Sequence, residues 1–94
     1  MYLTFTEYGL FLGLKSERLV VKKDSQNIKE FPLNRVKFIV IDGNGITLSS
    51  NLIMQCSLRG IHIFVVNFKN EVISSLYGTQ YHLHQYINVS NANT

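Results

Sequence analysis

The stretch that decides the fold reads Val36-Lys37-Phe38-Ile39-Val40-Ile41 and runs into Asp42-Gly43-Asn44-Gly45. Its β-branched and aromatic residues favour a strand, and its near-continuous apolar character predicts burial on both faces. The glycines that follow favour a tight turn, because glycine adopts positive φ without steric cost. A second apolar stretch, residues 61–67, has the same character. We therefore expect this pair of strands to be central to the fold.

Between these two strands the hydrophobic period changes from that of a strand to that of a helix. Leu48, Leu52 and Cys56 are spaced by four residues, which places them on one helical face. Ser49 or Ser50 can cap the first turn, since a serine oxygen accepts from free first-turn amides. Gly60 is typical of the position that ends a helix. The pattern predicts a helix over residues 50–59.

Strand patterns dominate the first half of the chain. Leu10, Leu12 and Leu14 alternate on one face, with Phe11 on the other. The turn formers Asp24-Ser25-Gln26-Asn27 predict a hairpin, and Pro32 should lie at a strand end or sheet edge because it lacks a backbone donor. The strands we expect outside the central pair cover residues 2–5, 10–14, 18–23, 28–31, 46–48 and 72–76.

These elements predict a mainly-β fold with one α-helix, built as two small packed sheets in a β-sandwich-like arrangement. We expect residues 1–78 to form this β-domain. Residues 79–94 are expected to be frayed, and to form a linker or the start of a further, helical domain.

Composition limits the possible functions. The chain has 94 residues, of which 16% are charged, against about 25% in an average globular protein. This sparse charge suggests a surface that a partner covers. The net charge of +3 permits nucleic-acid binding without demanding it.

The single cysteine forms no internal disulfide, and no signal peptide or membrane-length apolar run is present. We therefore expect a cytoplasmic protein that makes no membrane contact.

Several residues invite a catalytic or metal-binding interpretation. His82 and His84 would share a face of a strand, but a metal needs at least a third ligand, and His62 is distant in sequence. Cys56 lies on the apolar helix stripe, which favours an inert core thiol over a nucleophile. The loop over residues 42–45 lacks the spacing of phosphate-binding motifs, and the carboxylates are scattered. We expect no catalytic residue and no metal ligand in this chain.

The basic residues carry a more interesting pattern. Lys15, Arg18, Lys22 and Lys23 flank two successive strands, and Arg35 and Lys37 come near the third. On a strand, Arg18 and Lys22 point to the same face. If that face is exposed it could contact phosphates, although ordinary solvated strand surfaces have a similar composition.

The order of the motifs carries a family resemblance over residues 2–78. Arg18-Leu19-Val20-Val21 precedes Pro32-Leu33, then a buried strand, then Gly43-Asn44, and finally a helix that ends in Arg59-Gly60-Ile61. This order resembles the N-terminal β-domain of the CRISPR-associated endonuclease that acts as the integrase of spacer acquisition. The resemblance supports the β-domain described above.

The resemblance implies that catalysis lies elsewhere. In the family, a larger helical domain holds a divalent metal site, implied to bind Mg or Mn, made from a Glu, a His and a further acidic residue. His62, His82, His84 and Glu71 do not match those ligands, so no catalytic residue is carried over. We expect these 94 residues to be inactive alone and to need no cofactor of their own.

The resemblance also implies an architectural role for the β-domain. In the family it mediates homodimerisation and helps to hold duplex DNA together with a second small CRISPR-associated adaptation protein. Tyr8, in Glu7-Tyr8-Gly9, could stack on a terminal base pair, or could simply pack the first hairpin. Arg18 and Lys22 are the other candidates for DNA binding. The alternative function is a small protein-interaction module with no nucleic-acid role.

Overall fold

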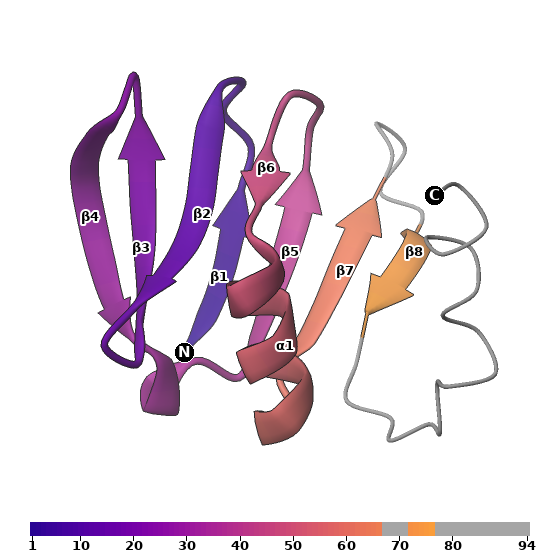
Figure 1. The fold of residues 1–94 in the computed structure, drawn as a ribbon. Helices are drawn as coiled ribbons and strands as arrows, with labels where there is room; N and C mark the ends of the chain where they lie inside the picture. The colour runs from indigo at the N-terminus through magenta and orange to yellow at the C-terminus, as the bar shows by residue number, and fades with distance from the viewer. Residues whose placement is uncertain (67–71, 77–94) are drawn as a thin grey trace, which may run out of the picture.

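The computed structural model describes residues 1–66 and, as backbone, residues 72–76. Within these residues the chain is mainly β with one α-helix, as the sequence predicts (Figure 1). The elements in chain order are β1 (Tyr2–Phe5), β2 (Leu10–Lys15), β3 (Arg18–Lys23), β4 (Gln26–Pro32), the 3-10 turn η1 (Leu33–Arg35), β5 (Phe38–Asp42), β6 (Thr47–Leu48), α1 (Ser50–Arg59), β7 (His62–Val66) and β8 (Val72–Leu76).

The strands in the described part of the chain form two four-stranded sheets. The first, which we call the mixed sheet, has the order β1-β5-β7-β8; β1, β5 and β7 are parallel, and β8 is antiparallel to β7. The second, the hairpin sheet, has the order β4-β3-β2-β6. The two predicted central strands are therefore direct neighbours, with Ile39 opposite Ile63.

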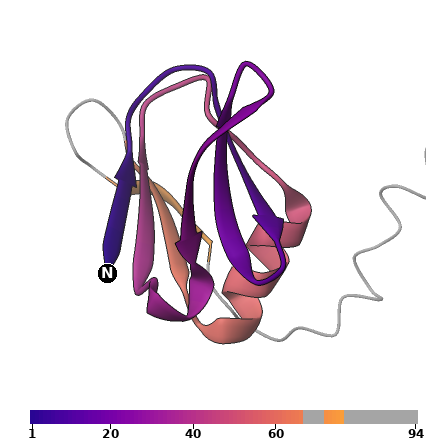
Figure 2. The same cartoon turned by 90° about the vertical axis from the view of Figure 1, so that its left-hand side faces the viewer.

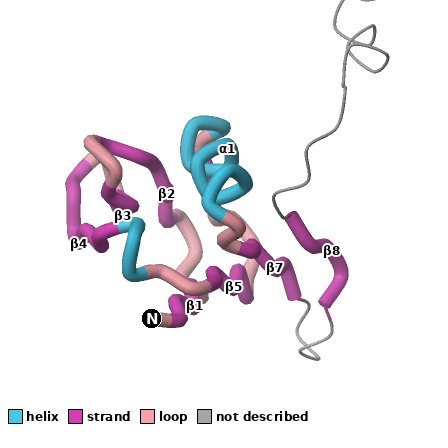
Figure 3. Tube along the Cα trace, turned by 90° about the horizontal axis from the view of Figure 1, so that it is seen from below, coloured by secondary structure: helices cyan, strands magenta, loops and turns pink. Residues whose placement is uncertain are grey.

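The chain order explains why these sheets form two layers. Parallel neighbours cannot be joined by a tight turn and need a crossover. The crossover from β1 to β5 contains β2, β3 and β4, and the crossover from β5 to β7 contains β6 and α1. Both crossovers lie on the same side of the mixed sheet, so the hairpin sheet and α1 together make the second layer (Figures 2 and 3).

Two tight turns set the register of the hairpin sheet. Ser16 and Glu17 join β2 to β3, and Asp24 and Ser25 join β3 to β4; all four residues have positive φ, between 50° and 65°. Two-residue turns of this kind match the right-handed twist of the strands. The turn predicted over residues 24–27 is thus shorter than expected, because residues 26 and 27 already pair with β3. Pro32 ends the edge strand β4, as predicted.

The core fills the space between the mixed sheet and the second layer. The most deeply buried side chains come from both layers and from η1: Leu12, Leu19, Leu33, Ile39, Leu52, Cys56 and Ile63. The ring of Phe5 meets that of Phe31 edge to face, at 6.5 Å between centroids, which links the two sheets. This arrangement confirms the predicted packing of two small sheets.

One expectation about the central strands is wrong. The sequence predicts a strand over residues 36–41 that is buried on both faces, but β5 begins at Phe38, and within β5 only Ile39 and Ile41 face the core. Phe38 and Val40 lie half-buried on the outer face of the mixed sheet. The physical reason is that both crossovers cover the same face, so within the described residues no element covers the other.

The helix has the predicted bounds and the predicted ends. The Ser49 hydroxyl oxygen accepts a hydrogen bond from the Leu52 amide at 3.1 Å, which caps the first turn. Gly60 has the left-handed conformation that ends the helix, and the Ile61 amide donates to the Cys56 carbonyl at 2.8 Å. Leu52 and Cys56 face the core and are fully buried, so Cys56 is a core thiol, as the helical spacing indicates.

The buried thiol predicts a dependence of stability on pH. Desolvation raises the pKa of Cys56 to about 11, above the ~8.5 of an exposed thiol. The unfolded chain therefore releases this proton first as pH rises, and the free energy of unfolding should fall between about pH 9 and pH 11. The slope from this group is at most about 1.4 kcal/mol per pH unit. Urea unfolding followed by circular dichroism across that range measures it.

The matched control is Cys56→Ala, which removes the thiol and should show a smaller loss of stability over the same range. An identical loss in both proteins would contradict the assignment to Cys56.

Candidate nucleic-acid interface

Tyr8 lies where two loops meet at one end of the mixed sheet. The loop after β1 and the loop after β5 run side by side, and the Gly9 amide donates to the Gly45 carbonyl at 3.0 Å. A side chain on Gly43 would place its Cβ 2.8 Å from the Thr6 carbonyl oxygen. The glycines after β5 therefore permit close contact between two loops, in keeping with the tight turn that the sequence predicts there.

The ring of Tyr8 rests directly on Gly45. A Cβ at Gly45 would lie 2.3 Å from two ring carbons of Tyr8, so only glycine leaves room for the ring in this position. The tyrosine nevertheless remains 71% exposed. The ring is thus supported on one side and open on the other, which is the geometry that a stacking platform needs.

The structure places Arg18 and Lys22 on the outer face of the hairpin sheet, as the strand alternation predicts. Their surroundings differ. The Arg18 Nε lies 3.0 Å from the Glu30 Oε1 across the strand pair, so its charge is partly neutralised. Lys22 makes no ion pair with any described residue, and its charge is available to an anion.

Two other cations are also paired. The Lys23 Nζ lies 2.9 Å from the Glu7 Oε2, and this hydrogen bond raises the pKa of Lys23 above its ordinary value. An Arg59 guanidinium nitrogen lies 2.8 Å from the Glu17 Oε1. Sequence reasoning could not separate paired from unpaired cations, because each of these pairs joins different elements.

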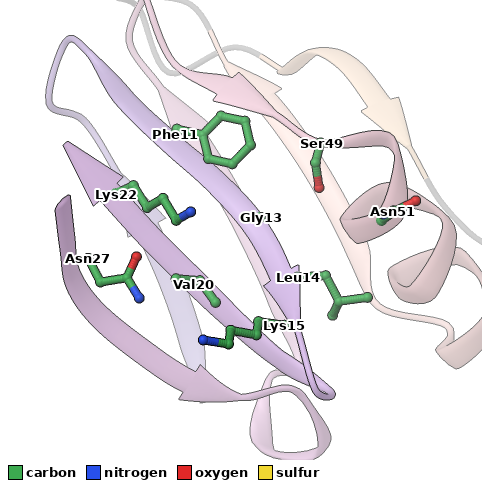
Figure 4. A pocket seen from close by; sticks show the side chains of 9 residues that line it. All are labelled: Phe11, Gly13, Leu14, Lys15, Val20, Lys22, Asn27, Ser49 and Asn51. Carbon is green, nitrogen blue, oxygen red and sulfur yellow. The ribbon is translucent and has the colours of Figure 1, made fainter. Parts of the chain in front are cut away.

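The outer face of the hairpin sheet also carries a groove that the sequence analysis missed (Figure 4). Phe11 forms one wall, and its ring covers Gly13; a Cβ at Gly13 would lie 2.8 Å from that ring. Val20, opposite Gly13 in the register, makes the floor and is only 2% exposed. The polar side chains of the lining are Lys15, Lys22, Asn27, Ser49 and Asn51, and the volume is about 320 Å³. In the sequence, the one indication of this groove is Phe11, an apolar residue at a position of β2 that strand alternation places on the outer face.

A cluster of aromatic side chains occupies the outer face of the mixed sheet. The rings of Tyr2 and Phe38 stack at 4.5 Å between centroids, and Phe64 meets Phe38 edge to face at 5.8 Å. The His62 ring lies 5.8 Å from that of Phe64. We call these four residues the aromatic face.

No metal site forms among the residues that the structure describes. His62 lies on the aromatic face, and no three His, Cys, Asp or Glu side chains in this part of the chain gather closely enough to hold an ion. His82, His84 and Glu71 lie outside the described residues. In the same part of the chain, α1 is too short to cross a membrane.

Comparisons with known proteins agree with this fold. The chain is 44% identical over 81 residues to the CRISPR-associated endonuclease Cas1 1 of Francisella tularensis subsp. novicida; the match covers 86% of this chain and 25% of that protein. The chain thus spans about a quarter of the length of this relative.

Two solved structures share the architecture at low sequence identity. A chain of a Cas6-RT-Cas1–Cas2 complex matches with a TM-score of 0.76 and 15% identity, over 94% of this chain and 10% of that one. The TtCas1–DNA complex matches with a TM-score of 0.68 and 9% identity, over 97% and 34%. The sequence profile of the family described as "CRISPR associated protein Cas1" matches residues 3–93. The chain therefore belongs to the Cas1 family.

Proposed function

We propose that this chain is the dimerisation and DNA-platform domain of a metal-dependent DNA endonuclease and integrase, which inserts new spacers into CRISPR arrays in antiviral defence. Membership of the Cas1 family supports the reaction class. The observation that carries the DNA role is Tyr8, an exposed ring held on Gly45 at the end of the mixed sheet.

Tyr8 would stack on the terminal base pair of a DNA duplex. Because Gly45 and the joined loops already support the ring, binding would cost little further ordering of the side chain. Lys22 would contact a phosphate where the duplex ends, and Arg18, which must share its charge with Glu30, would contribute less. These contacts position the duplex without reading its sequence.

The described residues do not fit a site for Mg or Mn. Such ions need several oxygen ligands in one place, and the carboxylates of Glu7, Glu17 and Glu30 each pair with a different cation on a different part of the surface. We therefore propose that cleavage and joining of DNA use residues beyond those described, and that this domain positions DNA without cutting it.

The proposed partners are a second copy of the chain and a small CRISPR-associated adaptation protein. The sparse charge of the chain and the exposed aromatic face support protein contacts. A Cas1–Cas2 complex among the proteins of similar fold is in keeping with the second partner. The free, buried Cys56 fits the reducing cytoplasm, where we place this function.

The alternative is an interaction module without a nucleic-acid role, which the aromatic face by itself would also suit. Binding to a DNA duplex distinguishes the DNA role from the interaction module. The DNA role predicts that the 94-residue chain binds a blunt-ended duplex with an affinity that falls steeply as salt rises, because phosphate contacts release counterions. Fluorescence anisotropy with a labelled duplex measures this, and no binding at low salt would favour the interaction module.

The stacking role of Tyr8 is tested with DNA ends. Tyr8→Ala should weaken binding to a blunt-ended duplex by about 5- to 150-fold, the loss of one base–aromatic stack, whereas Tyr8→Phe should retain it. A dumbbell duplex closed at both ends offers no terminal base pair and is the control. If Tyr8→Ala weakens binding to both DNAs equally, Tyr8 does not stack on ends.

The contact between the Tyr8 ring and Gly45 leads to a separate prediction. Gly45→Ala should move the Tyr8 ring, because the added Cβ occupies its place, and should weaken binding to blunt ends. Gly45 has φ of 74°, so the alanine also costs about 1 kcal/mol of backbone strain. Gly9→Ala is the matched control, since Gly9 has φ of 89° but open space around it. Equal effects of both variants on end binding would argue against the support.

Dimerisation is tested by sedimentation. We expect the chain to form dimers at tens of micromolar, roughly the range of weak specific association, and Tyr2→Ala to shift it towards monomer, because Tyr2 is 69% exposed and stacks on Phe38. Ile28→Ala, at an exposed apolar residue of β4, is the control. A clean monomer of the unsubstituted chain would contradict the dimer.

A further inference from the structure

The groove on the hairpin sheet extends beyond the hollow shown in Figure 4. Phe11 and Lys22 line that hollow and also a second one, of about 350 Å³, whose other lining residues are Gly9, Asp24 and Ser25. The two hollows therefore form one track on the outer face. One end of the track lies at Gly9, next to Tyr8, and the other lies at Lys15 and the N-terminus of α1.

The lining of the first hollow combines positive charge with an aromatic wall. Lys15 and Lys22 make no ion pair with a described residue, and among the same residues no carboxylate lines this hollow. They stand near opposite ends of the β2–β3 strand pair, because Lys22 of β3 lies opposite Phe11 near the start of β2, whereas Lys15 is the last residue of β2. At about 3.3 Å per residue this separates their backbones by roughly 13 Å. An occupant with several negative charges along its length would complement this spacing.

Of the described residues, Asp24 is the single acidic one in the lining of the two hollows. It stands at the turn between β3 and β4, at the margin of the track. The charge of the track as a whole remains positive, with Lys15 and Lys22 facing Asp24 alone.

We propose that this track binds an unpaired strand of nucleic acid, with Phe11 stacking on a base and with Lys15 and Lys22 contacting phosphates. The proposal rests on the DNA role of Tyr8: where Tyr8 stacks on the last base pair, one separated strand continues past Gly9 into the track. Asn27 and Asn51 supply donors and acceptors for base edges or sugars, and Val20 supplies an apolar floor.

The size of the track favours a single strand over a duplex. Its first hollow, about 320 Å³, is at the low end of small-ligand pockets, ~300–1,000 Å³, so it admits a nucleotide rather than a double helix. An acidic peptide is less suitable. Peptides commonly bind as an added strand at a free sheet edge. The track instead lies on the face of the sheet, where β3 is paired on both sides and β2 is paired with β3 along its length and with β6 at Phe11 and Leu12.

The test compares two DNA probes on the 94-residue chain. Phe11→Ala should weaken binding of a single-stranded oligothymidine by about 5- to 150-fold and leave binding to the closed dumbbell duplex within about twofold. Phe11→Tyr should retain the single-strand affinity. Phe11 is 37% exposed and points away from the core, and thermal unfolding of each variant confirms that it folds. Ile28→Ala is the control for loss of an exposed apolar side chain.

Lys22→Gln gives an independent readout. It should reduce the slope of log affinity against log salt for oligothymidine by about 0.7, the value for one phosphate contact on a single strand. Lys37→Gln, which removes an exposed lysine outside the track, should leave that slope unchanged.

Three results would overturn the proposal: no loss of oligothymidine binding in Phe11→Ala, an equal loss on the dumbbell, or displacement of oligothymidine by an equal concentration of polyglutamate. Failure of the Tyr8 role is distinguishable, since it would appear as end binding unaffected by Tyr8→Ala while the single-strand affinity still depends on Phe11.

Discussion

The parallel pairing of β5 between β1 and β7 is the constraint on which the rest of the structure depends. Leu3, Ile39 and Ile63 lie side by side in this register and form one face of the core. Parallel strands cannot be joined by tight turns, so the chain must leave the sheet after β1 and again after β5. The hairpin sheet and α1 are formed by the two crossovers that result.

The same constraint brings Tyr8 to Gly45. In a parallel pair the carboxyl ends of both strands lie at the same edge of the sheet, and β1 pairs with β5 through Phe5 and Ile41. The loops that follow these strands must therefore emerge together, although residues 8 and 45 are far apart in sequence. Sites in sheets of this kind gather at the same edge for the same reason.

Covering one face of the mixed sheet leaves two outer faces with different chemistry. The outer face of the mixed sheet carries the aromatic face, which suits a protein partner. The outer face of the hairpin sheet carries lysines, amides and Phe11, which suit an anionic chain with planar groups. A small domain can in this way offer separate surfaces for a partner and for nucleic acid, with Tyr8 at the end of the molecule.

The sequence by itself determined the local elements. The helix over residues 50–59, the alternation in β2, the edge position of Pro32 and the buried Cys56 all follow from local period, capping and backbone chemistry. Tertiary structure decided the features that depend on distant residues: which face of β5 is covered, which cations are paired, and how Phe11, Gly13 and Val20 form a groove. Periodicity specifies the two faces of a strand, but only the path of the chain between strands decides what covers each face.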